Sequence, residues 1–75
     1  MLKRFEVVGN VTPTLCRELG GAFTLGAARR LAEKFAKEES AKPVDEREFY
    51  SFDVDNGRGT VLYTAHLKDF LEAAE

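Results

Sequence analysis

The sequence has a single cysteine, Cys16, and no apolar run near the length of about 20 residues that crosses a membrane. One cysteine excludes an intrachain disulfide and any zinc site built from several cysteines. Because small secreted domains usually depend on disulfides, this composition favours an intracellular location. The amino terminus also lacks the apolar segment and cleavage site of a signal peptide. We therefore expect a cytoplasmic protein that does not enter a membrane.

Groups suited to catalysis are scarce as well. The only histidine is His66, and a cysteine–histidine pair would need a third group to orient it. Cys16 falls on the apolar side of its segment, which predicts a buried structural cysteine, and His66 is predicted to lie at the surface or to cap a helix. The spacing from Asp53 to Arg58 departs from that of a calcium loop, where the sixth position is glycine. We predict no catalytic residue, no metal site, no cofactor and no enzyme.

The chain has 75 residues, of which 44% are apolar and 32% are charged. This composition is typical of a folded domain, and the length predicts one domain over residues 1–75. A core of this size leaves a net stability of only about 3–5 kcal/mol. Association with a second copy would compensate for so small a core, so a homo-oligomer is one expected state.

Residues 49–65, FYSFDVDNGRGTVLYTA, have the pattern of a β-hairpin. Asn56-Gly57 favours a two-residue type I′ turn because both residues tolerate positive φ. That turn would pair Asp53 with Thr60 and Phe52 with Val61. Side chains alternate along a strand, so one face would be apolar and the other mainly polar. The apolar face would collect Tyr50, Phe52, Val54, Val61 and Tyr63, and the polar face Ser51, Asp53, Asp55, Arg58, Thr60 and Thr64, with Phe49 and Leu62 toward its far end.

Three further segments have clear patterns. Residues 3–8 alternate as a strand does, and residues 25–39 carry apolar side chains at helical spacing, with Thr24 as a candidate N-cap. Residues 66–74 predict a short helix with Leu67, Phe70 and Leu71 on one side. The fold class is therefore α+β: a small antiparallel sheet of three or four strands packed on one long helix, with a short C-terminal helix.

Residues 12–19 fit two structures. Thr12-Pro13 resembles an N-cap followed by proline at the first helical position, and Gly20 suits the end of a helix. The other interpretation makes residues 14–19 a strand that forms a hairpin with residues 3–8. Because three signals agree, the short helix is favoured.

The segment LCRELGGAFTLGAARRLA partly resembles a helix-turn-helix, with Leu19-Gly20 at the turn and Arg29 and Arg30 on the second helix. The resemblance implies a nucleic-acid-binding protein with the hairpin as a wing. The chain departs from the motif at Gly26 and Arg29, where aliphatic residues are usual. Its net charge of −2 also differs from the basic charge typical of DNA-binding domains.

The charge is unevenly distributed along the chain. Residues 1–37 carry seven basic and three acidic side chains, whereas residues 38–75 carry four basic and ten acidic ones. An acidic surface speeds association with a basic partner, and compact acidic domains are common among small regulators and inhibitors. We expect a non-catalytic protein-binding or regulatory domain that uses the acidic hairpin face or a sheet edge. The expected partner-binding residues are Asp53, Asp55, Arg58, Thr60, Phe49 and Leu62.

Overall fold

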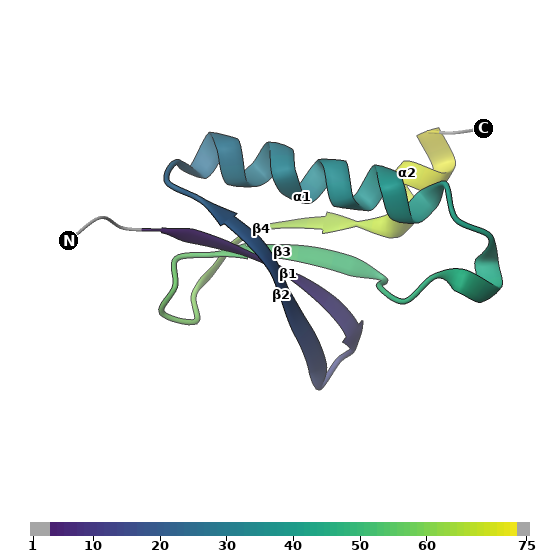
Figure 1. Cartoon of the computed structure of the whole chain (residues 1–75), viewed down its shortest axis with the longest axis horizontal. Coiled ribbons are helices and arrows are strands. Elements are labelled where there is room, and N and C mark those ends of the chain that lie inside the picture. The colour runs from purple at the N-terminus through teal and green to yellow at the C-terminus, as the bar shows by residue number, and fades with distance from the viewer. Residues whose placement is uncertain (1–3, 74–75) are drawn as a thin grey trace.

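The computed structural model describes residues 4–73, which form one sheet with helices on one side. In chain order the elements are β1 (Phe5–Thr12), β2 (Leu15–Ala22), α1 (Leu25–Ser40), the 3₁₀ turn η1 (Val44–Glu46), β3 (Ser51–Asp55), β4 (Val61–His66) and α2 (Leu67–Ala73). All neighbouring strands are antiparallel, in the order β2-β1-β3-β4, and α1 lies across one face of the sheet (Figure 1). The predicted α+β fold is confirmed, with four strands.

β2 occupies the segment for which a short helix was favoured, so that prediction was wrong. The Thr12 hydroxyl accepts hydrogen bonds from the backbone N–H groups of Thr14 (3.2 Å) and Leu15 (3.0 Å). An N-cap hydroxyl would accept similar bonds, but here they close the turn between β1 and β2. The helix-turn-helix interpretation of this segment is also wrong, because a strand replaces its first helix.

The core lies between α1 and the sheet. Ala28, Ala32 and Ala36 recur every fourth residue on α1 and are fully buried, and their small size lets the helix approach the strands closely. The largest fully buried side chains are those of Val7, Phe52 and Val54. Burial is therefore spread over small side chains, and larger ones such as Phe35 pack around them.

The hairpin between β3 and β4 has a different register from the predicted one. Asp53 lies opposite Thr64 rather than Thr60, and Phe52 opposite Ala65 rather than Val61. Residues 56–60 form a longer loop, in which Gly57 and Gly59 have positive φ and Asn56 does not. Asn56 instead uses its side-chain oxygen to accept from the N–H groups of Arg58 (2.8 Å) and Thr60 (3.3 Å). A type I′ turn at Asn56-Gly57 was thus wrong.

The register shift spans four residues, an even number, so it leaves most side chains on the predicted face. Phe52 and Val54 are buried beneath α1, and Tyr63 packs against the same core. Tyr50 and Val61 are 46% and 52% exposed, so their assignment to the buried face was wrong. A one-residue shift would have reversed the two faces.

Phe49 packs on the helix side of the sheet, contrary to its predicted place on the polar face. Its ring lies 5.5 Å from that of Phe52, centroid to centroid. Gly9 makes room for it: a Cβ atom at Gly9 would lie 2.6 Å from the Phe49 ring and 2.9 Å from Leu19. Phe49 is therefore half-buried and packs on the helix side of the sheet, not on the predicted polar face.

The carboxyl end of α1 is tied to the start of β3 by a buried carboxylate. Glu39 is only 3% exposed and accepts hydrogen bonds from the backbone N–H groups of Glu48 (2.6 Å) and Phe49 (2.7 Å). Its other oxygen contacts the Lys42 ammonium at 2.8 Å. Burial by itself would raise the pKa of Glu39, but the hydrogen bonds from Lys42 and the two N–H groups outweigh it and lower the pKa.

Candidate partner-binding face

The face of the sheet opposite α1 carries no other element of residues 4–73 (Figure 1). We call it the open face. Alternation assigns its residues, because Val7, Phe52 and Val54 point to the helix and their strand neighbours point away. The open face consists of Arg4, Glu6, Val8, Asn10, Cys16, Glu18, Ser51, Asp53, Asp55, Leu62, Thr64 and His66.

A polar network joins three strands at the centre of the open face. The Asn10 side-chain amide donates to Ser51 Oγ and to Asp53 Oδ2, both at 2.9 Å. The Thr64 hydroxyl donates to Asp53 Oδ1 at 2.8 Å. Asp53 therefore connects β1, β3 and β4, and both of its oxygens are hydrogen-bonded. The predicted polar face is confirmed for Ser51, Asp53 and Thr64.

Acidic side chains flank this network. Glu6 lies directly opposite Asp55 on the neighbouring strand. Val8 lies between Glu18 on one side and Asp53 on the other, so a second pair of carboxylates is separated by one apolar residue. Among residues 4–73 the ion pairs are Arg17–Glu48 and Glu39–Lys42, and neither involves an acid of the open face.

The six residues predicted to bind a partner are only partly brought together. Asp53, Asp55 and Leu62 belong to the open face, and Leu62 is 45% exposed at a bulge opposite Asp55. Arg58 and Thr60 lie in the exposed loop that follows β3, beyond the end of that face. Phe49 lies on the other side of the sheet, as described above.

Two of these acids also hold the fold, which the sequence did not indicate. Asp53 is bonded to Asn10 and Thr64, and Asp55 Oδ1 accepts from the Gly57 N–H at 2.7 Å. A lysine at either position could not accept these hydrogen bonds, so charge reversal would remove them.

Glu6 and Glu18 belong to this face although the sequence did not predict them there. Their strands lie in the first half of the chain, which is basic overall, and the pairing of β1 with β3 is a long-range contact. The alternation of residues 3–8 already separated Glu6 and Val8 from Phe5 and Val7. Placing Glu6 beside Asp55 required knowledge of the strand order.

Cys16 and His66 lie on the same row of the open face but at its opposite edges. The row runs from Cys16 through Asn10 and Ser51 to His66, three interstrand spacings, which is roughly 14 Å. This separation is too large for a hydrogen bond between a nucleophile and a base. Cys16 is exposed, so its predicted burial was wrong, whereas the surface position of His66 is confirmed.

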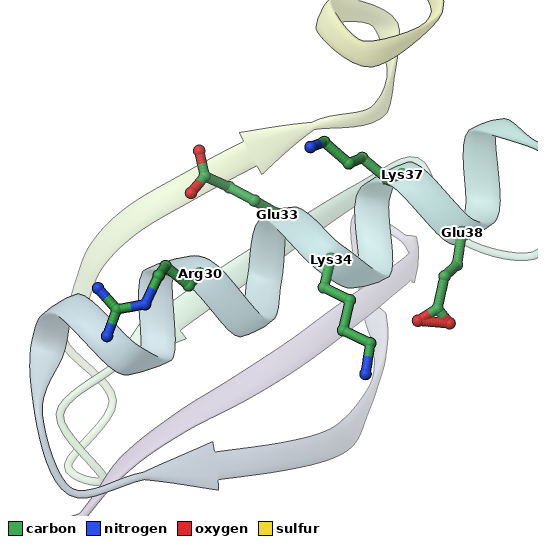
Figure 2. A pocket seen from close by; sticks show the side chains of 5 residues that line it. All are labelled: Arg30, Glu33, Lys34, Lys37 and Glu38. Carbon is green, nitrogen blue, oxygen red and sulfur yellow. The ribbon is translucent and has the colours of Figure 1, made fainter.

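The outer side of α1 has a shallow depression, but its lining does not converge. Arg30, Glu33, Lys34, Lys37 and Glu38 surround it. Figure 2 shows Glu33 and Lys37 extending toward one side of the helix and Lys34 and Glu38 toward the other. Glu33 is instead associated with the sheet, because its carboxylate accepts from the Tyr63 hydroxyl at 3.4 Å and Arg29 lies 4.6 Å over the Tyr63 ring.

Within residues 4–73, no three histidine, cysteine or acidic side chains gather in a way that could hold a metal ion. No helix in that range has the length and apolar character needed to cross a membrane. Comparisons with protein-family models, with curated proteins and with solved structures found no match. The open face is therefore the best-defined candidate site among the residues that the structure describes.

Proposed function

We propose that this chain is a non-catalytic binding domain that contacts a basic region of another protein with the open face of its sheet. A regulatory or inhibitory role would follow from occupying that partner's basic surface. The observation that carries the proposal is the placement of Glu6 opposite Asp55, beside the row that contains Glu18 and Asp53.

Electrostatics favours a cationic partner. Like charges directly opposite each other on neighbouring strands destabilise a sheet, and Glu6 and Asp55 have this arrangement. A lysine or arginine placed between their carboxylates would relieve the repulsion and form charge-assisted hydrogen bonds. Arg4 already lies on this face over Gly21, the residue opposite Glu6, and a basic partner would bring further cations to the acidic pair.

The surroundings of the acids also suit protein binding. Val8 lies between the two carboxylates of its row, and Leu62 is exposed at the edge of the same face. Apolar side chains within a charged surface supply the buried contact area that charges alone do not provide. The acids would then mainly raise the association rate, and Val8 and Leu62 would slow dissociation.

An NMR titration with a lysine-rich peptide tests the proposal. The peptide should shift the backbone amide signals of β1, β3 and the edge strand β2 around Glu6, Asp53 and Glu18. The competing acidic segment consists of Asp45, Glu46 and Glu48; it lies in and beside η1, outside the sheet, and Glu48 is ion-paired with Arg17 of β2. Signals that shift mainly in that segment would overturn the proposal.

A matched pair of variants completes the test. Glu6→Gln with Glu18→Gln removes two charges from the open face without breaking any of the hydrogen bonds described above. Glu38→Gln with Glu46→Gln removes two exposed charges elsewhere. The first pair should weaken peptide binding at low salt and the second should not; equal weakening would mean that only net charge matters. Tighter, strongly salt-dependent binding of random-sequence duplex DNA would instead support the nucleic-acid alternative.

A further inference from the structure

Strand β4 is an edge of the sheet that lacks the usual protection against pairing. Its sequence is VLYTAH, with no Asp, Glu, Lys or Arg, and no glycine or proline. Val61 and Leu62 are 52% and 45% exposed. Edge strands commonly avoid pairing by carrying charged side chains or bulges, and β4 has only one bulge, at its first residues. The regular part, from Tyr63 to His66, remains open to another strand.

The backbone groups available at this edge follow from the hydrogen-bond pattern. The Leu67 N–H donates to the Tyr50 carbonyl at 3.0 Å, in line with the pairing of Phe52 with Ala65. Hydrogen-bonded and non-hydrogen-bonded pairs alternate in an antiparallel ladder. Ala65 and Tyr63 therefore bond to β3, whereas Thr64 directs its N–H and C=O groups, and His66 its N–H, away from the sheet. The His66 carbonyl directly precedes α2 and serves as an acceptor for the first turn of that helix.

The opposite edge, β2, is better protected. It carries Arg17 and Glu18, two glycines in its second half, and a bulge where it pairs with the middle of β1. Each of these features hinders regular pairing with a further strand. The two edges of the sheet therefore differ in their capacity to accept a partner.

We propose that β4 pairs antiparallel with β4 of a second copy, so that two sheets join into one of eight strands. In an antiparallel pair of identical strands, a charged residue would lie close to the same charge on the second copy. Because β4 has no Asp, Glu, Lys or Arg, its pairing with itself brings no like charges together. A register centred on Thr64 pairs Thr64 with the partner's Thr64, a favourable cross-strand pair. It places Leu62 opposite the partner's His66.

The charges of α1 beside this edge are of both signs. Arg29 and Glu33 lie on the β4 side of α1, where both contact Tyr63. A second copy would therefore not meet a surface of a single charge there. The inference does not depend on the proposed function, because it rests on the main-chain groups of β4 and not on the acids of the open face.

Analytical ultracentrifugation over a range of concentrations tests the inference. A Cys16→Ser background removes disulfide-linked dimers. The protein should change from the chain mass of 8.4 kDa to twice that mass as its concentration rises. His66→Pro removes only an outward N–H group and should raise the dimer dissociation constant at least about tenfold, because the dimer loses two main-chain hydrogen bonds.

The two edges supply a matched pair of substitutions. Leu62→Lys in β4 and Leu15→Lys in β2 make the same change at positions that are 45% and 49% exposed. Leu62→Lys should weaken the dimer and Leu15→Lys should not, with far-UV circular dichroism confirming that each variant folds. A single 8.4 kDa species at every concentration would overturn the inference. So would equal effects of the two lysines, or species larger than a dimer.

Discussion

Replacing Glu39 with glutamine tests how far one buried carboxylate stabilises the junction between α1 and β3. Glutamine has nearly the same shape but no charge, and its single carbonyl oxygen must serve the donors that two carboxylate oxygens now serve. In the wild type the N–H groups of Glu48 and Phe49 lie 2.6 and 2.7 Å from Glu39 Oε2. Hydrogen bonds to a charged group contribute about 1.5–3 kcal/mol each.

We expect Glu39→Gln to lower the free energy of unfolding by about 2–4 kcal/mol, since both bonds weaken and neither is lost outright. That is most of the roughly 3–5 kcal/mol expected for a domain of this size. With a urea m-value near 1 kcal/mol per molar, the midpoint should fall by about 2 M or more. Glu38→Gln, one residue earlier and exposed, should change the urea midpoint only slightly, as surface substitutions usually do.

The stability difference between the wild type and Glu39→Gln should also depend on pH. Because the folded-state pKa of Glu39 is lowered, its contribution is complete above the ordinary carboxyl pKa and disappears as pH falls through the lowered value. Glutamine resembles the protonated acid, so the stability difference between wild type and Glu39→Gln should shrink toward acidic pH. Equal midpoints at neutral pH, or a difference that grows in acid, would refute this account of Glu39.

Two further predictions concern packing and exposure. Gly9→Ala should destabilise the fold by about 1–3 kcal/mol, because the new Cβ overlaps the Phe49 ring; urea denaturation in a Phe49→Leu background should show a smaller cost, and strict additivity would contradict the proposed contact. Cys16 should react with a thiol reagent in the native protein about as fast as in urea, since it is exposed on an edge strand; strong protection from labelling would place it in an interface or in the core.

The sequence alone determined which segments are apolar on one side, because that information is local. The spacing of residues 25–39 and the Thr24 cap specified α1, and the Thr24 hydroxyl does accept from the Ala27 N–H at 3.1 Å. Alternation placed Phe52 and Val54 beneath the helix and Asp53 on the other side. These assignments are correct although the predicted register of β3 and β4 was wrong, because a shift by an even number of residues leaves each residue on the same side of the sheet.

Some sequence signals occur both at the ends of a helix and in a strand hairpin, so the local sequence could not distinguish these two structures. The Thr12 hydroxyl bonds to the same kind of N–H groups in a turn as in a helix cap, and glycine follows helices but also occurs in strands. Pairing with β1 favoured the strand. Gly20 then lies beneath α1, where a Cβ atom would meet Leu31 at 3.3 Å, so its small size serves helix packing and does not end a helix.

The candidate site was decided by tertiary structure. Glu6 and Asp55 are 49 positions apart in sequence and became neighbours only because β3 inserts between β1 and β4. Glu39 looked like one of several solvated acids, yet the chain that follows α1 turns back and presents two N–H groups to it. Composition and periodicity describe each segment separately, whereas the free energy of these contacts depends on which segments the folded chain brings together.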